Sequence, residues 1–392
     1  MTHSLSSPFS QQELQELRTL FPHIKDGKIY MNHAAIGPMP TPVYEVTRHH
    51  LDVRHSGSVE NFEEGMQLIT DARGHAAAYI NAKTPENITF MGNTSDAISA
   101  VANGLSWNDG DEIILNRIEF PSNVYPFRRL EEHGVVIKYA PGSNHKVDPK
   151  EIEALITPKT KLVSISAVQY LGGFKADLHS IGEICKRHNI WFVVDGIQAL
   201  GATPVDVQNC NIDALCSGGH KWMMSPLGSG FLYLSPRLQP ALKPFKTGWL
   251  SVEEPWNLSD FEQPWLPVSA HLETGTPNLI GITGLGAALK LFRDIGTDNI
   301  RDHIFHISGM VRQLVANQKG AELLTPLPVE QRMGIVTFKA EQTRTDPETV
   351  IKELKRKSVT ISAREGYFRI SPHFYNTEEE AEAVINMLFK EL

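Results

Sequence analysis

Continuous apolar runs, rather than strict alternation of apolar and polar residues, mark the strands predicted for the first two thirds of the chain. Residues 161–169, 190–194 and 230–234 are mostly apolar runs of this kind. Such a run is typical of a strand buried on both faces, as in a parallel sheet. Segments with helical periodicity, at about 97–105 and 181–188, lie between the strands. This alternation predicts an α/β fold with a right-handed, doubly wound sheet.

The pattern changes in the last part of the chain, where short strands mix with two helices. The strands are expected at 334–339, 359–362 and 367–371, and the helices at 347–355 and 377–392. Such a mixture is typical of a small α+β domain. A helix over residues 10–20 begins with capping-box spacing. We predict a large domain over 22–285 and a small α+β domain over 286–392, with residues 1–21 packed against the small domain.

The composition excludes some classes of function. The chain has 392 residues, a net charge of -8 and 41% hydrophobic residues. An acidic balance gives no electrostatic footprint for nucleic acid, and no apolar run is long enough to span a membrane. Three cysteines, at 185, 210 and 216, show neither a disulfide framework nor metal-type pairing. We therefore expect a protein of the reducing cytoplasm, without a metal site and without nucleic-acid or membrane partners.

An acid and a lysine follow two of the predicted strands. Asp195 ends the run at 190–194, and Lys221 follows a glycine pair after a short run at 212–216. Open α/β sheets bind their ligands at the carboxyl ends of the strands. A desolvated lysine becomes a Schiff-base nucleophile, and an acid can hold the nitrogen of a pyridine ring protonated. Together the two residues suit pyridoxal 5'-phosphate (PLP), whereas each alone also fits a helix cap or a surface position.

The segment DGIQ at 195–198, followed by His220-Lys221, resembles the class V aminotransferase family of fold-type I PLP-dependent enzymes. This family includes cysteine desulfurases, selenocysteine lyases, kynureninases and isopenicillin N epimerases. The likeness extends from about Ile29 to the C-terminus. It implies a mostly parallel seven-stranded sheet between helices, a small α+β C-terminal domain and a homodimer with shared active sites. It also implies that Lys221 forms the Schiff base with PLP, with Asp195 and His220 as further catalytic residues.

The resemblance assigns other residues to the cofactor. Thr94 and Ser95 lie in a turn before a helix, where free backbone N–H groups favour a phosphate, although plain helix capping is the alternative. Phe120 corresponds to a residue that stacks on the pyridine ring, a role that resembles core packing. Thr276 is expected to touch the phosphate of the partner subunit, or to cap the next helix. The full set is Thr94, Ser95, Phe120, Gln169, Asp195, Gln198, Ser217, His220, Lys221 and Thr276, in which the two glutamines are expected near the phenolic oxygen of PLP.

Four residues are expected at the substrate. Arg369 matches the arginine that grips the α-carboxylate in the family, and a planar guanidinium suits that task. A surface arginine on an edge strand is the alternative. Asn32 and His33 lie in a turn that borders the substrate site in the family, and local hydrogen bonds explain this turn equally well. Arg364 lies in the short loop that precedes Arg369.

These assignments predict an enzyme that acts at the α-carbon of a small amino acid. A cysteine desulfurase or selenocysteine lyase-like enzyme and an epimerase are the alternatives. The loop at 362–369, where a desulfurase needs its nucleophilic cysteine, contains none, which argues against the usual desulfurase reaction. Two other classes are a non-catalytic binding protein with this fold and a nucleotide-binding protein that uses the turn at 92–96. The latter lacks a GxGxxG or P-loop fingerprint.

Overall fold

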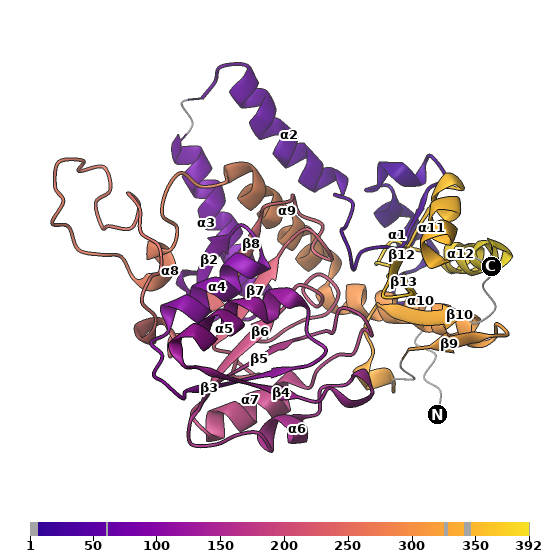
Figure 1. The fold of residues 1–392 in the computed structure, drawn as a ribbon. Helices are drawn as coiled ribbons and strands as arrows, with labels where there is room; N and C mark the ends of the chain where they lie inside the picture. The colour runs from indigo at the N-terminus through magenta and orange to yellow at the C-terminus, as the bar shows by residue number, and fades with distance from the viewer. Residues whose placement is uncertain (1–6, 60–61, 325–327, 341–345, 392) are drawn as a thin grey trace.

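A seven-stranded sheet lies at the centre of the larger part of the chain in the computed structural model (Figure 1). The strand order is β2-β8-β7-β6-β5-β3-β4, and only β8 runs antiparallel to its neighbours in this sheet. The predicted fold class, a mostly parallel sheet between helices, is confirmed. The structure describes residues 7–59, 62–324, 328–340 and 346–391. The strands are β2 (Ile88–Met91), β3 (Glu112–Asn116), β4 (Val136–Ala140), β5 (Thr160–Ser166), β6 (Trp191–Asp195), β7 (Ala214–Gly218) and β8 (Gly230–Leu234).

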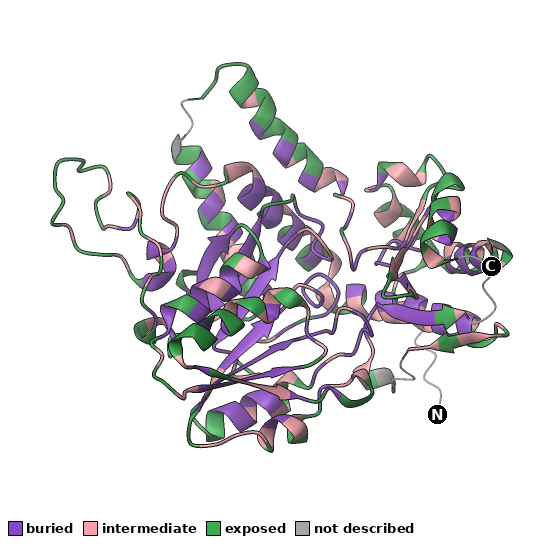
Figure 2. Ribbon diagram, in the orientation of Figure 1, coloured by how far each residue is buried: buried purple, intermediate pink, exposed green. Residues whose placement is uncertain are grey.

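Both faces of this sheet are buried, as the coloured ribbon in Figure 2 shows. Phe192 and Val194 of β6 pack in one hydrophobic core, and Val193 between them packs in another. Helices α4 and α5 cover the face of Val193, and α3, α7 and α9 cover the opposite face. The apolar runs are continuous because each strand serves both cores. The helices of this part are α2 (Thr41–His55), α3 (Phe62–Tyr79), α4 (Thr94–Gly104), α5 (Tyr125–Arg128), α6 (Pro149–Glu153), α7 (Leu178–Arg187), α8 (Val268–His271) and α9 (Leu279–Ile295).

The smaller part of the chain has its own sheet and its own core. Its four-stranded sheet has the order β12-β13-β10-β9, and a third hydrophobic core lies between this sheet and its helices. The predicted boundary at residue 285 falls inside α9, which packs on α2 and α3 of the larger part. We therefore propose that the domain boundary lies at Gly296. The elements are β9 (Ala321–Leu323), β10 (Val336–Ala340), β11 (Val359–Thr360), β12 (Ser362–Arg364), β13 (Tyr367–Ile370), α10 (Thr297–Ala316), α11 (Pro347–Arg356) and α12 (Glu378–Glu391).

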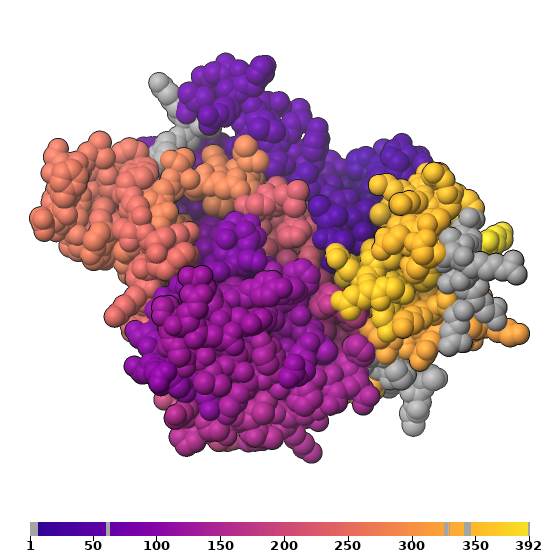
Figure 3. Space-filling view, in the orientation of Figure 1, coloured from indigo at the N-terminus to yellow at the C-terminus, as the bar shows by residue number. Residues whose placement is uncertain are grey.

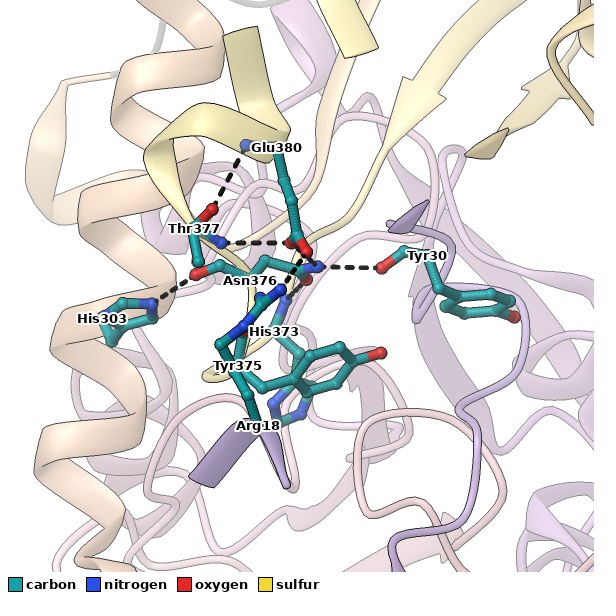
Figure 4. A network of polar contacts seen from close by, with 8 residues as sticks. All are labelled: Arg18, Tyr30, His303, His373, Tyr375, Asn376, Thr377 and Glu380. Carbon is teal, nitrogen blue, oxygen red and sulfur yellow. Dashed lines mark hydrogen bonds and ion pairs between the residues drawn. The ribbon is translucent and has the colours of Figure 1, made fainter. Parts of the chain in front are cut away.

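The N-terminal segment is tied to the smaller part. Strand β1 (Ile29–Tyr30) pairs in parallel with β11. Helix α1 (Gln11–Arg18), which begins with the predicted capping box, places Arg18 against the start of α12. Figure 4 shows how Arg18 donates to the carbonyl oxygen of Tyr375 and to Glu380, both at 2.7 Å. Asn376 donates to Tyr30 O at 3.2 Å, so the first and last elements close into one unit.

A long segment between β8 and α8 stands apart from the body of the molecule. It extends as an open loop beside α8 in Figure 1 and forms the lobe at the left edge of Figure 3. Its aromatic side chains point outward, and Phe261 is 91% exposed. Trp256 and Trp265 are also largely exposed. None of the helices in the described ranges is long and apolar enough to cross a membrane.

Candidate active site

The carboxyl ends of the central strands meet at one cavity of ≈ 290 Å³. The turns after β2, β6 and β7 contribute to its wall, and the hairpin of β12 and β13 closes it from the smaller part. The cavity thus lies where open α/β sheets bind their ligands. Its lining residues are Ala34, Ala35, Asn93, Thr94, Ser95, Phe120, Ser122, Tyr170, Ile197, Gln198, His220, Lys221, Arg364 and Arg369.

The backbone that carries Lys221 is held from two sides by glycines. The N–H of Gly37 donates to His220 O at 2.8 Å. A Cβ atom on Gly37 would lie 2.3 Å from Lys221 O, and one on Gly201 would lie 2.2 Å from the carbonyl carbon of Trp222. Gly201 also has a φ of +99°, a conformation that side chains disfavour. These close approaches require glycine at both positions.

Burial and two cations act on the Lys221 side chain. Burial lowers the pKa of its ammonium group, and the guanidinium groups of Arg369 and Arg364 lower it further, while Asp195 opposes them. The Nζ atom lies 5.6 Å from the centroid of the Phe120 ring. An amine with a lowered pKa is more often unprotonated at neutral pH, which is what a Schiff-base nucleophile requires.

Asp195 lies at the end of β6, is 2% exposed and is not itself one of the lining residues. Its carboxylate accepts the N–H of Ile197 at 2.9 Å. Burial raises the pKa of Asp195, and the charge of Glu119 raises it further, while Lys221 counteracts both. A buried carboxylate with a single hydrogen bond is costly to ionise unless a cation binds beside it. A protonated pyridine nitrogen is a cation of that kind.

Glu119 is a second buried carboxylate, and the sequence analysis did not single it out. It accepts hydrogen bonds from Asn116 Nδ2, from the backbone N–H and hydroxyl of Ser166, and from Gln169 Nε2 at 2.9 Å. These donors fix Glu119 and, with it, the backbone of the neighbouring Phe120. Gln169 thereby faces Glu119 and is not among the lining residues. Its Oε1 atom has no hydrogen-bond partner in the described ranges.

The turn before α4 presents two hydroxyl groups. Asn93 caps the helix, since its side chain accepts the N–H of Asp96 at 3.0 Å. The side chains of Thr94 and Ser95 therefore do not serve as the cap, and both line the cavity. Thr94 Oγ1 accepts the N–H of Gly218 at 2.9 Å, which joins this turn to the end of β7. The positive end of α4 and these hydroxyls suit a phosphate.

His220 and Gln198 also line the cavity. Burial lowers the pKa of His220, and the charge of Lys221 lowers it further. The Gln198 amide donates to Ala34 O at 3.0 Å and accepts Trp222 Nε1 at 2.8 Å. One amide N–H of Gln198 remains for a ligand.

Besides Asp195 and Gln169, four further predicted residues lie outside the lining. Ser217 is fully buried and donates to Gly218 O at 3.1 Å. His33 is also fully buried, where its ring nitrogens contact Ser371 O at 2.9 Å and the Tyr375 hydroxyl at 3.1 Å. The residues of this turn that line the cavity are the next two along the chain, Ala34 and Ala35. The other two lie elsewhere: Asn32 forms an isolated bridge to Ser371, and Thr276 is exposed on the surface.

Arg369 holds an unsatisfied nitrogen within the site. Its Nη1 donates to Tyr170 O at 2.9 Å and its Nε to Ser362 Oγ at 3.3 Å. Its Nη2 is buried and has no hydrogen-bond partner among the residues that the structure describes. An unpaired buried donor is unfavourable, so this guanidinium fits a carboxylate that enters the cavity.

The lysine, the buried acid, the aromatic ring and the hydroxyl-lined helix end fit PLP, and the fold and site together define a PLP-dependent enzyme of fold type I. The chain belongs to the class V aminotransferase family, because residues 29–384 match the family described as "Aminotransferase class-V". The predictions of this family and of a PLP-dependent enzyme are confirmed.

Individual relatives agree with this assignment. A probable cysteine desulfurase of Borreliella burgdorferi is 31% identical, with 95% of each chain covered. The apo structure of a cysteine desulfurase from Thermococcus onnurineus superposes with a TM-score of 0.87 at 25% identity, covering 96% of this chain and 97% of the other. A complex of the cystine C–S lyase C-DES with cysteine persulfide has a TM-score of 0.85 at 24% identity, covering 94% and 98%, and shows the shared fold.

We predict that replacing Asp195 changes how stability depends on pH. The folded-state pKa of Asp195 is raised, so its burial destabilises the cofactor-free protein increasingly as the pH rises above the unfolded-state value of about 4. The melting temperature of apo Asp195→Asn, relative to wild type, should therefore be higher at pH ~8 than at pH ~5. Differential scanning fluorimetry measures this difference, and the exposed Asp294→Asn is the control. An equal difference at both pH values would contradict the assignment.

Proposed function

We propose that the protein is a PLP-dependent enzyme that acts at the α-carbon of a small amino acid through Lys221. The observation that supports this proposal is the position of Lys221, an amine with a lowered pKa that lines the cavity and interacts with the charges of Asp195 and Arg369. A non-catalytic binding protein would not need an amine with a lowered pKa beside a buried acid.

The chain's own residues have separate tasks in this reaction. PLP, when bound, supplies an electron sink for negative charge at the α-carbon. Asp195 would hold the ring nitrogen, Phe120 the ring face, and Thr94, Ser95 and His220 the phosphate. The remaining N–H of Gln198 would reach the phenolic oxygen, with Gln169 and Ser217 supporting the site from behind.

The substrate would be held by its carboxylate and lose a proton from its α-carbon. Arg369 offers its unpaired Nη2 to the carboxylate. Lys221 Nζ would be the base that takes the α-proton and returns it. Asn32 and the turn that follows would border the substrate. Transamination, elimination and epimerisation share these steps.

We predict that borohydride reduction of the holoenzyme attaches the cofactor to Lys221. Peptide mapping by mass spectrometry should find the label there and nowhere else, and Lys221→Ala should remain unlabelled. Lys175 is the matched control, because burial also lowers its pKa while it lies outside the cavity. Lys175→Ala should keep the label on Lys221. A label on a different lysine would refute the assignment.

We further propose a homodimer in which Thr276 completes the phosphate site of the partner. Thr276 is exposed and outside the cavity of its own chain. The protruding loop that carries Trp256, Phe261 and Trp265 exposes a large apolar surface, and such surfaces mark protein interaction sites.

We predict that Phe261→Asp dissociates this dimer and weakens PLP binding. Sedimentation equilibrium should show a dimer for the wild type and a monomer for the variant, and fluorescence titration should give a PLP dissociation constant raised about tenfold or more. Val136→Asp is the control, since Val136 is exposed at the opposite edge of the sheet. A wild-type monomer that binds PLP as tightly as any assembled form would exclude the proposal.

A desulfurase or C–S lyase reaction is the second candidate, and the relatives' names favour it. The described residues that line the cavity include no cysteine. Cys185 and Cys216 are buried, burial raises the pKa of both thiols, and burial raises the pKa of Cys210 to about 11. Thiols that stay protonated are poor nucleophiles. The lyase form, which needs no protein cysteine, therefore fits better than persulfide transfer. The three free thiols also support a reducing, cytoplasmic location.

We predict that replacing all three cysteines by alanine leaves the α-carbon chemistry largely intact. Cofactor absorbance changes with amino acids should persist within about threefold of wild type, because none of the thiols touches the cavity. Circular dichroism checks the fold, since removing buried side chains lowers stability. If activity is lost through Cys216→Ala alone, with fold and PLP binding retained, the persulfide reaction becomes the better description.

A further inference from the structure

We propose that Arg364 forms a second anion subsite in the cavity, and that the substrate is an amino acid whose side chain ends in a carboxylate. This inference rests on the proposed function, which assigns Arg369 to the α-carboxylate. It adds a specificity-determining residue and a substrate class.

The hairpin of β12 and β13 places the two arginines on one face. Ser362 pairs with Arg369, and Arg364 pairs with Tyr367. Side chains two residues apart on a strand share a face, so Arg364 is the diagonal neighbour of Arg369. Diagonal positions in an antiparallel pair lie about 7–8 Å apart. Two guanidinium groups at this spacing suit two anionic groups separated by a few bonds.

The tip of this hairpin is fixed rather than open. The Tyr170 hydroxyl donates to Glu365 Oε1 at 2.5 Å. Glu365 has a φ of 52° and the next residue, Gly366, a φ of 80°, which makes a tight turn. The Tyr170 ring packs edge-on against Phe120 at 5.3 Å between centroids. Arg364, adjacent to this anchored residue, is thereby held at the cavity wall.

The Arg364 side chain, unlike the Arg364 backbone in the hairpin, has no hydrogen bond or ion pair within the described part of the chain. The acid beside it in sequence, Glu365, is engaged by Tyr170. The positive charge of Arg364 nevertheless acts inside the site, because it lowers the pKa of both Arg369 and Lys221. Arg364 is exposed and lines the cavity, so its guanidinium is available to pair with an anion that enters.

The charges of the lining residues lead to the same conclusion. Lys221, Arg364 and Arg369 line the cavity, and none of the described lining residues is an Asp or Glu. The predicted phosphate site lies on a different element, at the start of α4. One carboxylate of the substrate satisfies Arg369. Arg364 then remains unneutralised unless the substrate carries a second acidic group.

The test compares acidic amino acids with their neutral isosteres on the holoenzyme. For wild type, kcat/KM should be higher with glutamate than with glutamine, or with aspartate than with asparagine. In Arg364→Gln this ratio should fall about tenfold or more. Arg364→Lys should retain part of it, and Tyr170→Phe should lower it. Arg187→Gln, which removes an exposed arginine on α7 outside the site, is the control and should leave the ratio unchanged.

A binding measurement supplies an independent readout. Isothermal titration of the holoenzyme with glutarate and butyrate should show tighter binding of glutarate in wild type and equal binding in Arg364→Gln. A wild type that favours neutral amino acids, or a ratio unaltered in Arg364→Gln, would overturn the subsite. If no amino acid changes the cofactor absorbance, the proposed function fails, and the titration alone decides on Arg364. Equal binding of glutarate and butyrate to wild type would then overturn it.

Discussion

Close packing of the backbone around Lys221 is the constraint on which the rest of the site depends. Gly37 and Gly201 approach this segment so closely that neither position has room for a Cβ atom. One glycine belongs to the turn after β1 and the other to the turn after β6, so two distant parts of the chain meet at the lysine. Because interiors are close-packed, the segment that carries Lys221 is confined by both turns. The acid, the ring and the arginine are placed relative to that segment.

The two buried carboxylates differ in how many hydrogen bonds they accept, and this difference distinguishes a structural role from a chemical one. Glu119 is surrounded by donors from three other residues and needs no further partner. Asp195 has one backbone donor and a raised pKa, which leaves it in need of a cation. A buried carboxylate is thus either fully hydrogen-bonded within the protein or available to a cation, depending on the donors around it. The unsatisfied group is the one that can serve a cofactor.

Much of the fold follows from sequence because both faces of the central sheet are buried. Continuous apolar runs predicted β5, β6 and β8 for that reason. Strand β4 gave no such signal, since it lies at the edge, carries Lys138 and is only partly buried. The split of the predicted strand at 359–362 into β11 and β12 depends on the distant partner β1. Local periodicity carries no information on such pairings.

For the site, local motifs were sufficient where function resides in a short segment. Asp195, Lys221 and the turn at Thr94 all lie at strand ends that the pattern reveals. Glu119 and Tyr170 act through partners far along the chain, Gln169 and Glu365 respectively, and no spacing rule predicts those contacts. His33 was expected near the substrate, yet the turn directs its side chain into an aromatic cluster with Tyr375 and His373.

The parallel pairing of β1 with β11 has a consequence for synthesis of the chain. The strand of Ile29 has no partner until Val359, about 330 residues later, has been synthesised. At roughly 5–20 residues per second, a ribosome needs roughly 15–65 s to supply it. All strands of the central sheet lie within residues 88–234 and leave the ribosome earlier. The larger part can therefore fold while the chain is still being made. The N-terminal segment takes its final place later, when β1 pairs with β11.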